Sequence, residues 1–199
     1  MKFKEKKKMI KNATFTCVEE KKMKILGISG KARNGKDTAA DIIKTKLEEL
    51  GYSVLKASYG DLVKYVCKTF FNWNGEKDEK GRTLLQYVGT DIIRNQVPDY
   101  WVDFIADMLD FFKSEWDYVL IPDCRFPNEI ERMKERGFDV YSMRVIRDGF
   151  KSDLTEEQLK HISETALDDY TFDFVVHNDK GLEDLREMLI PEVVDKILM

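Results

Sequence analysis

The feature that most constrains the fold is a glycine-rich, basic loop between an apolar run and an amphipathic segment. The run "KILGIS" predicts a buried strand, and "DTAADIIKTKLEEL" repeats its apolar residues with helical spacing and stops at Gly51. Between them, Gly30 and Gly35 enclose four residues and are followed by Lys36, which is the GxxxxGK spacing of a phosphate-binding loop. This order of strand, loop and helix predicts an α/β sheet that holds a phosphate at the end of a strand.

Crowded cations in this loop indicate an anionic ligand. Glycines let consecutive backbone N–H groups curl around a phosphate, and the helix start adds its partial positive charge. Lys31, Arg33 and Lys36 gather at this helix N-terminus, where cations are unfavourable without an anion. A tight turn that binds nothing is the alternative, and it leaves this crowding unexplained. After the lysine, the usual Ser or Thr is replaced by Asp37, and Thr38 follows one step later.

The composition limits what the chain can be. Its 199 residues, 43% of them hydrophobic, are enough for one α/β core. A formal net charge of -4 gives no overall positive field for nucleic acid, so we expect a small ligand that is held locally. No apolar run approaches the roughly 18 residues that span a bilayer, so no membrane partner is expected. Three cysteines without a CxxC pair and two distant histidines indicate neither disulfides nor zinc, and they fit a cytoplasmic protein.

Residues 1–22 form a lysine-rich N-terminal extension ahead of a single domain at 23–199. The charge run has no periodicity, which leaves three interpretations: a disordered tail, an edge hairpin around "ATFTCV", or a leader upstream of a start at Met23. Lysine runs are usually solvated, so we do not expect this extension to bind nucleic acid.

From Met23 onward, apolar runs alternate with amphipathic segments, which is typical of a parallel sheet with helices on both faces. The five predicted strands are "KILGIS", "SVLKAS", "YVLIPD", "FDVYSMRVIR" and "DFVVHN". Pro98 separates the helical segments "TLLQYVGTDIIRNQ" and "DYWVDFIADMLDFFKSE". Thr155 and Gln158 have capping-box spacing and predict a short, mobile helix. The aromatic residues expected in the core are Tyr100, Phe104, Phe111 and Phe112.

A second group of polar residues lies in "VLIPDCRFPNE". Four mostly apolar residues lead to Asp123 and put its carboxylate at the carboxyl end of a strand, where open α/β sheets bind ligands and an acid can meet the magnesium shell. Arg125 lies two residues on, within reach of a phosphoryl group. Singly, an N-cap aspartate and a surface arginine would be the plainer explanations, but the phosphate-binding loop favours a joint role.

Other segments follow in a recognisable order: "QYVGTDIIR", "PDCRFPNEI", "MRVIR", "HISE" and "NDKGLEDL". Together with "GKARNGKDT" they resemble the phage-type deoxynucleoside monophosphate kinases, a branch of the P-loop nucleoside monophosphate kinases, over about residues 23–190. The resemblance implies a P-loop NTPase fold, a mobile lid at about 147–164 and an acceptor-binding helical region at about 59–113. It also implies that the γ-phosphoryl group of ATP passes, with Mg²⁺, to a deoxynucleoside monophosphate.

By this resemblance, the loop binds the polyphosphate of ATP. Lys36 would contact the β- and γ-phosphates, Arg33 would lie beside the transferring group, and Thr38 and Asp123 would lie near Mg²⁺. The whole set of loop residues assigned to ATP is Gly30, Lys31, Ala32, Arg33, Asn34, Gly35, Lys36, Asp37 and Thr38. The expected catalytic residues are Arg33, Lys36, Asp123, Arg125 and Arg147.

The lid region is expected to cover the donor nucleotide. Arg147 ends the fourth strand, where adenylate-kinase-like enzymes stack an arginine on the adenine, and Asn178 and Asp179 follow the last strand where this fold usually contacts the adenine. In "HISE", Ser163 and Glu164 would fix the lid when it closes, with a surface turn as the alternative. Closure would exclude water from the γ-phosphate.

The acceptor nucleotide is expected in the helical region. Arg94 and Arg125 would grip its phosphate, because a guanidinium makes bidentate contacts. Asp61 would orient the sugar or the attacking oxygen, or is simply the N-cap of its helix. The remaining residues assigned to the acceptor are Gln86, Thr90, Trp101 and Glu164, of which Trp101 offers a stacking surface.

Two other functions remain as alternatives. A small-molecule kinase of the same fold, such as dephospho-coenzyme A kinase or phosphomevalonate kinase, would keep the loop and lid but use a different acceptor pocket. A non-catalytic nucleotide-binding P-loop protein would carry a conventional Ser or Thr after the lysine and fewer converging arginines, the opposite of this chain. Related enzymes often pair, so a homodimer is an alternative to a monomer.

Overall fold

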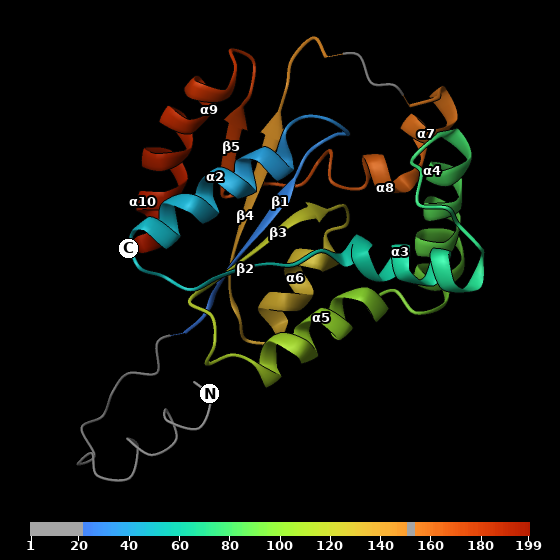
Figure 1. Ribbon diagram of the computed structural model, residues 1–199, viewed down its shortest axis with the longest axis horizontal. Coiled ribbons are helices and arrows are strands. Elements are labelled where there is room, and N and C mark those ends of the chain that lie inside the picture. The colour runs from blue at the N-terminus through green and yellow to red at the C-terminus, as the bar shows by residue number, and fades with distance from the viewer. Residues whose placement is uncertain (1–21, 151–153) are drawn as a thin grey trace.

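A parallel sheet of five strands forms the centre of the computed structural model, which describes residues 22–150 and 154–199 (Figure 1). The strands are β1 (Lys24–Ser29), β2 (Val54–Lys56), β3 (Tyr118–Cys124), β4 (Asp139–Ile146) and β5 (Phe174–His177). Their order across the sheet is β2-β3-β1-β4-β5, and each pairing is parallel. The carboxyl ends of the strands therefore meet at one edge. The predicted five-stranded parallel sheet is confirmed.

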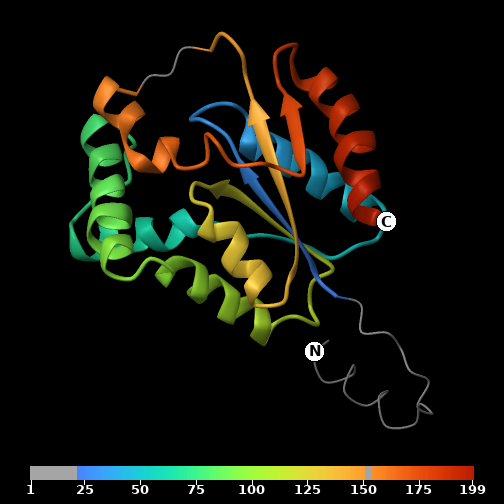
Figure 2. The same ribbon diagram turned by 180° about the vertical axis from the view of Figure 1, so that it is seen from behind.

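Helices cover both faces of this sheet, as the alternating segments predict (Figures 1 and 2). One face is covered by α2 (Lys36–Glu49), α9 (Leu182–Leu189), the π-helix η3 (Ile190–Val194) and α10 (Asp195–Leu198). The other is covered by α3 (Tyr59–Phe70), α5 (Tyr100–Phe111) and α6 (Asn128–Glu135). Because successive strand residues point to opposite faces, Leu26 and Ile28 join the first core and Ile25 joins the second.

A further group of helices lies beside α3, beyond the strand ends (Figure 1). It consists of α4 (Glu79–Gln86), the π-helix η2 (Tyr87–Arg94) that continues it, α7 (Glu156–Lys160) and α8 (Ile162–Thr165). The predicted capping box is confirmed, since Thr155 and Gln158 make both of its hydrogen bonds at the start of α7. Gln158 Nε2 also donates to Glu79 O at 3.1 Å and to Thr83 Oγ1 at 3.2 Å, so α7 packs on α4.

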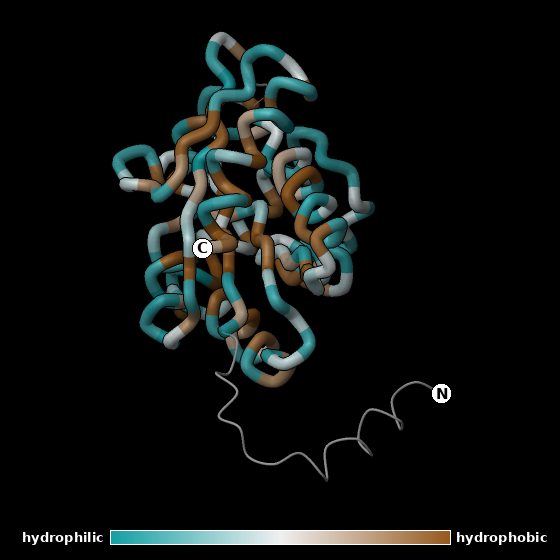
Figure 3. Tube along the Cα trace, turned by 90° about the vertical axis from the view of Figure 1, so that its left-hand side faces the viewer, coloured by the Kyte–Doolittle hydropathy of each residue, from teal (hydrophilic) through white to brown (hydrophobic). Residues whose placement is uncertain are grey.

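The prediction that four aromatic residues around α5 lie in the core is wrong. The exposed fractions are 49% for Tyr100, 42% for Phe104, 75% for Phe111 and 54% for Phe112. A helix on the surface of a sheet presents one stripe to the core, and in α5 that stripe consists of Trp101, Val102, Ala106 and Leu109. Hydrophobic and hydrophilic residues are mixed along the tube of Figure 3. In α5 the apolar residues cover more of the helix than the face that turns inward, so the apolar pattern alone does not select that face.

The predictions for residues 1–21 and for the part of the lid at 151–153 lie outside the described residues. Met23 is 6% exposed and packs in the same core as Ile25 and Trp101, so the folded domain includes it. Within the two described ranges, none of the helices has the length and apolar character needed to cross a membrane.

Candidate active site

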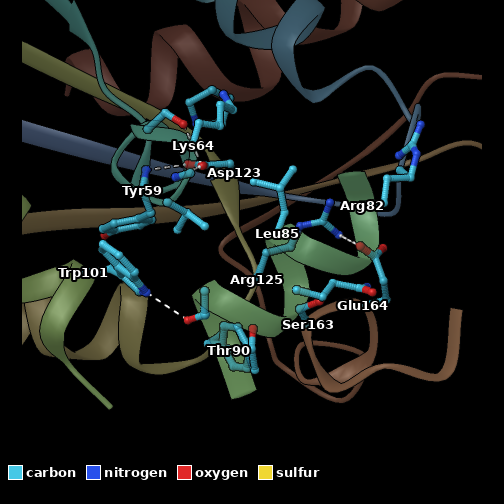
Figure 4. Close-up of a pocket in the computed structure, with 18 of the residues that line it drawn as sticks. Tyr59, Lys64, Arg82, Leu85, Thr90, Trp101, Asp123, Arg125, Ser163 and Glu164 are labelled. Carbon is cyan, nitrogen blue, oxygen red and sulfur yellow. Dashed lines mark hydrogen bonds and ion pairs between the residues drawn. The ribbon is translucent and has the colours of Figure 1, made fainter. Parts of the chain in front are cut away.

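An open cavity of about 540 Å³ lies beyond the carboxyl ends of β1 and β3 (Figure 4). Its walls come from the glycine-rich loop, the start of α3, the continuous helix formed by α4 and η2, the turn after β3, and α8. Four carboxylates line it: Asp37, Asp123, Glu129 and Glu164. Seven cations line it as well: Arg33, Lys36, Lys64, Lys77, Arg82, Arg94 and Arg125. In a chain with a net charge of -4, this local excess of cations favours an anionic ligand in the cavity.

Two glycines give the loop after β1 its shape. Gly30 and Gly35 have φ angles of 149° and 96°, which side chains rarely allow. A Cβ atom on Gly30 would lie 2.4 Å from Val145 O, and one on Gly35 would lie 2.4 Å from Asn178 Nδ2. The loop therefore approaches the ends of β4 and β5 closely, and both predicted glycines are needed at their positions.

Lys36 is the first residue of α2 and folds back over the loop. Its Nζ donates to Gly30 O at 2.8 Å and to Lys31 O at 2.9 Å, and the residue is only 8% exposed. Burial, with a smaller contribution from the charge of Arg125, lowers the pKa of Lys36 from 10.5 to about 7. An anion bound next to Lys36 would stabilise the protonated amine and raise its pKa again. The charged form of Lys36 therefore favours an anionic ligand.

Residues at the ends of β4 and β5 hold the loop and do not line the cavity. Asn178 Nδ2 donates to Asn34 O at 3.0 Å, and Asn34 Nδ2 donates to Val145 O at 3.3 Å. Asp179 Oδ1 accepts a hydrogen bond from the backbone N of Asp148 at 2.7 Å. The Arg147 guanidinium lies 5.0 Å from the ring centroid of Phe150. Of the three residues predicted to contact the adenine, Asn178 contacts the loop, and all three lie outside the walls of this cavity.

Asp123 lines the cavity and also anchors the start of α3. Its Oδ2 accepts from Ser58 Oγ and from Gly60 N, both at 2.7 Å, and its Oδ1 accepts from Tyr59 N at 3.2 Å (Figure 4). A carboxylate has about four acceptor positions, so about one remains for a ligand or a water molecule. Thr38, the other residue predicted near Mg²⁺, is exposed and lies outside the cavity walls.

Arg125 is paired with a carboxylate from α8. Its Nη1 lies 2.7 Å from Oε1 of Glu164, whose side chain is only 7% exposed (Figure 4). The second oxygen, Oε2, is buried and has no hydrogen-bond partner among residues 22–150 and 154–199. Lys31 Nζ donates to Glu164 O at 2.5 Å and to Asp168 Oδ1 at 2.6 Å, which ties this segment to the glycine-rich loop. The charge of Arg125 is therefore balanced inside the protein.

Arg94 lines the cavity, but its terminal nitrogens are engaged elsewhere. Nη1 donates to Asn128 Oδ1 at 2.9 Å, and Nη2 donates to Glu129 Oε1 at 2.5 Å. The bidentate grip on a phosphate that the sequence suggested for Arg94 is not available in this arrangement, because its guanidinium fork already points at protein acceptors.

The residues predicted for the acceptor base lie together, and Asp61 lies apart from them. Gln86, Thr90 and Trp101 line the cavity, although Trp101 is 2% exposed and its Nε1 donates to Gly89 O at 2.9 Å. Asp61 lies outside the cavity walls, in the first turn of α3, and pairs with Lys64 at 2.6 Å. Nor is it the N-cap, because Ser58 holds that position.

Sequence reasoning missed four charged residues of the cavity: Lys64, Lys77, Arg82 and Glu129. Burial, and then the charges of Lys64 and Arg82, lower the pKa of Lys77, so these cations share one environment. Glu129 stands in the quoted segment "DCRFPNE" and could have been singled out there. The other three stand in polar stretches that resemble any solvated surface, so no local signal marks them.

The fold and the loop define a P-loop kinase-like protein. A solved structure of APS kinase CysC from Mycobacterium tuberculosis, in complex with AMPPNP and APS, has a TM-score of 0.50 with it. The two chains are 12% identical over 86% of this chain and 98% of that one, which supports the fold.

The chain belongs to the deoxynucleotide monophosphate kinase family, whose model matches residues 57–189. It is 40% identical to the deoxynucleotide monophosphate kinase of Enterobacteria phage T4 over 106 residues, which cover 52% of this chain and 41% of that protein. It is 28% identical to a putative deoxynucleotide monophosphate kinase of Acanthamoeba polyphaga mimivirus over 195 residues, 84% of this chain and 95% of that protein. The match thus spans about two fifths of the phage T4 relative.

Proposed function

We propose that this protein transfers the γ-phosphoryl group of ATP to a deoxynucleoside monophosphate, with ADP and a deoxynucleoside diphosphate as products. The observation that carries the proposal is a GxxxxGK loop that opens into a cavity with seven cations and four carboxylates. Phosphoryl transfer requires two anionic substrates to be held in line while their charge is neutralised, and such a cavity suits that task. Membership of the deoxynucleotide monophosphate kinase family supports the choice of acceptor.

On the donor side, the polyphosphate of ATP would lie in the loop at residues 30–38. Its charge would raise the pKa of Lys36 again and draw Nζ away from the carbonyl oxygens of Gly30 and Lys31. Arg33 lines the cavity from the same loop and would lie beside the transferring group. Asp123 and Thr38 would hold Mg²⁺, which would supply positive charge to neutralise the phosphates. Asp123 fits that role through water, since about one acceptor position stays free.

On the acceptor side, Arg125 would bind the phosphate by exchanging Glu164 for it. A phosphate carries more charge than a carboxylate and offers a guanidinium the same planar pair of oxygens, so the exchange is favourable. The acceptor base would then lie toward Gln86, Thr90 and Trp101, which line the same cavity.

We expect the segment with α7 and α8 to act as a lid that excludes water from the γ-phosphate. Its contacts join the donor and acceptor regions, because Lys31 of the loop donates a hydrogen bond to Glu164 O, and Gln158 donates one to Glu79 O in α4. Arg147, Asn178 and Asp179, at the ends of β4 and β5, would face the adenine.

The test is a crossed assay of ATP·Mg²⁺ with all common ribo- and deoxyribonucleoside monophosphates, with formation of the diphosphate measured by chromatography. We expect transfer to at least one deoxynucleoside monophosphate and a loss of at least about a hundredfold in Lys36→Ala. Dephospho-coenzyme A and phosphomevalonate serve as competing acceptors. Transfer to one of these instead, or ATP binding without any transfer, would refute the proposal.

A further inference from the structure

Glu129 is a buried carboxylate in the cavity wall for which phosphoryl transfer has no direct use. It is 4% exposed and is the second residue of α6. Its Oε1 accepts from Arg94 Nη2, and its Oε2 accepts from the backbone N of Arg125 and, at 3.0 Å, of Phe126. Both oxygens are therefore used, and they join η2 to the turn after β3.

The partner, Arg94, is held on three sides. Besides Glu129, its Nη1 donates to Asn128 Oδ1 at 2.9 Å and to Pro98 O at 3.2 Å. Its guanidinium carbon lies 4.0 Å from the ring centroid of Phe126, at a distance typical of a cation–π contact. The side chain thus has one orientation.

One donor of Arg94 is left over. The Nε atom is buried and makes no hydrogen bond with the part of the chain that the structure describes, although Arg94 lines the cavity. A buried donor without a partner is unfavourable in a folded protein, so this atom calls for a bound water molecule, ion or ligand. The Arg94 side chain is 9% exposed, so bulk water has little access to it.

We propose that Glu129 is a positioning residue of the acceptor site, which turns Arg94 so that only its Nε–H serves the acceptor nucleotide. It does so by binding Nη2, while its second oxygen fixes the backbone of Arg125, the residue assigned to the acceptor phosphate. This inference rests on the proposed function, because it assumes that the cavity holds an acceptor nucleotide.

A buried ion pair of this kind is weak evidence for stability, because desolvation offsets much of its attraction. The ion pair does fix the orientation of the Arg94 guanidinium, which a hydrophobic contact of the same volume would not do. A purely structural pair and a positioning pair therefore differ in what breaks when the charge is removed. The first would lower stability and the use of both substrates alike, whereas the second would affect the acceptor alone.

The charge on Glu129 adds a second readout. Burial raises the pKa of Glu129 to about 7, with the charge of Arg94 and the backbone amides of Arg125 and Phe126 acting against that rise. Protonation near neutral pH would therefore weaken its hold on Arg94. The other titratable groups that face it are Asp123 and Cys124 at the end of β3 and Tyr59 on α3.

The experiment compares wild type with Glu129→Gln, using ATP and the best deoxynucleoside monophosphate of the crossed assay. We expect the KM for the acceptor to rise at least tenfold in Glu129→Gln, while the KM for ATP changes less than threefold. Glu129→Asp keeps the carboxylate and should therefore show a smaller rise in the KM for the acceptor. Between pH 8 and pH 6, the acceptor KM should rise more in wild type than in Glu129→Gln. Glu135→Gln, on the exposed side of the same helix, is the matched control and should behave as wild type.

Three outcomes separate this inference from the proposed function. No transfer by wild type to any monophosphate would refute the function, and the inference with it. If wild type transfers the phosphoryl group, but Glu129→Gln changes the KM for the acceptor and the KM for ATP equally, or changes neither, the inference alone is refuted. If Glu129→Gln does not fold, as judged by circular dichroism, then Arg94→Lys must give the same selective rise in acceptor KM, and an unchanged KM there would overturn the inference.

Discussion

Replacing Lys36 by methionine should stabilise the free protein and remove nearly all of its activity. Lys36 is 8% exposed, and burial lowers its pKa from 10.5 to about 7. In the unfolded chain the ammonium stays protonated up to its ordinary pKa, so folding at neutral pH must take a charge out of water. Methionine has an unbranched chain of similar length without the charge, and it adapts to irregular surroundings.

The size of the effect follows from the contacts. A pKa lowered from 10.5 to about 7 corresponds to about 5 kcal/mol, at about 1.36 kcal/mol for each pKa unit. Against this, the two carbonyl oxygens of Gly30 and Lys31 lose their donor, at a cost of about 1 kcal/mol each. The net gain is about 2 to 3 kcal/mol, or about 5 to 10 °C in Tm for a chain of this size.

The pH dependence has a definite sign. Between pH 7 and 10.5, the unfolded chain holds a proton on Lys36 that the folded protein has released. Wild type therefore gains stability as the pH rises through this range, and its deficit relative to Lys36→Met shrinks. Below pH 7 both states hold the proton, and the deficit is largest.

Urea denaturation at pH 7 and pH 9.5, followed by circular dichroism, measures this difference. Lys46→Met, on a partly exposed position of the same helix, is the control and should change stability by less than about 0.5 kcal/mol. Phosphoryl transfer by Lys36→Met should fall at least about a hundredfold. A Lys36→Met protein less stable than wild type at pH 7, or an equal difference at both pH values, would refute the reasoning.

Two further substitutions test the loop and the α8 contact. Gly35→Ala should lower the free energy of unfolding by about 1 to 3 kcal/mol, because φ is 96° and the new Cβ would lie 2.4 Å from Asn178 Nδ2. Gly137, with a φ of 88° and no atom near the position of a Cβ, is the control, and Gly137→Ala should lower the free energy of unfolding less than Gly35→Ala. Equal losses in thermal unfolding would contradict a role for the contact with Asn178. Glu164→Gln removes the ion pair with Arg125 and should tighten the binding of inorganic phosphate severalfold in titration calorimetry. Unchanged or weaker binding would argue against the exchange of Glu164 for a phosphate.

The elements that the sequence predicted well are those with a local signature. The five strands read as short apolar runs, and the loop between Gly30 and Lys36 carries its own spacing. The capping box of Thr155 and Gln158 also depends only on neighbours in the chain. Each of these features is decided within a few residues, so one sequence suffices to find it.

Helix α5 shows where local pattern fails. Apolar residues cover most of this helix apart from the face of Asp103, Asp107 and Asp110, so the apolar arc is wider than the face that the helix buries. Phe111, predicted in the core, is 75% exposed, whereas Trp101 is 2% exposed, lines the cavity and donates its Nε1–H to Gly89 O. The position of α5 against α6 and η2 made that choice.

One sequence was enough to predict the parallel sheet, the phosphate-binding loop and the position of Asp123 and Arg125 at the end of a strand. Which side chains meet across the cavity became visible in the folded chain: Glu164 with Arg125, and Glu129 with Arg94. These partners lie 39 and 35 residues apart in the sequence, on elements that meet only when the chain is folded. A short motif contains information only about residues that are close in the sequence, whereas the residues of a binding site come together from distant segments when the chain folds.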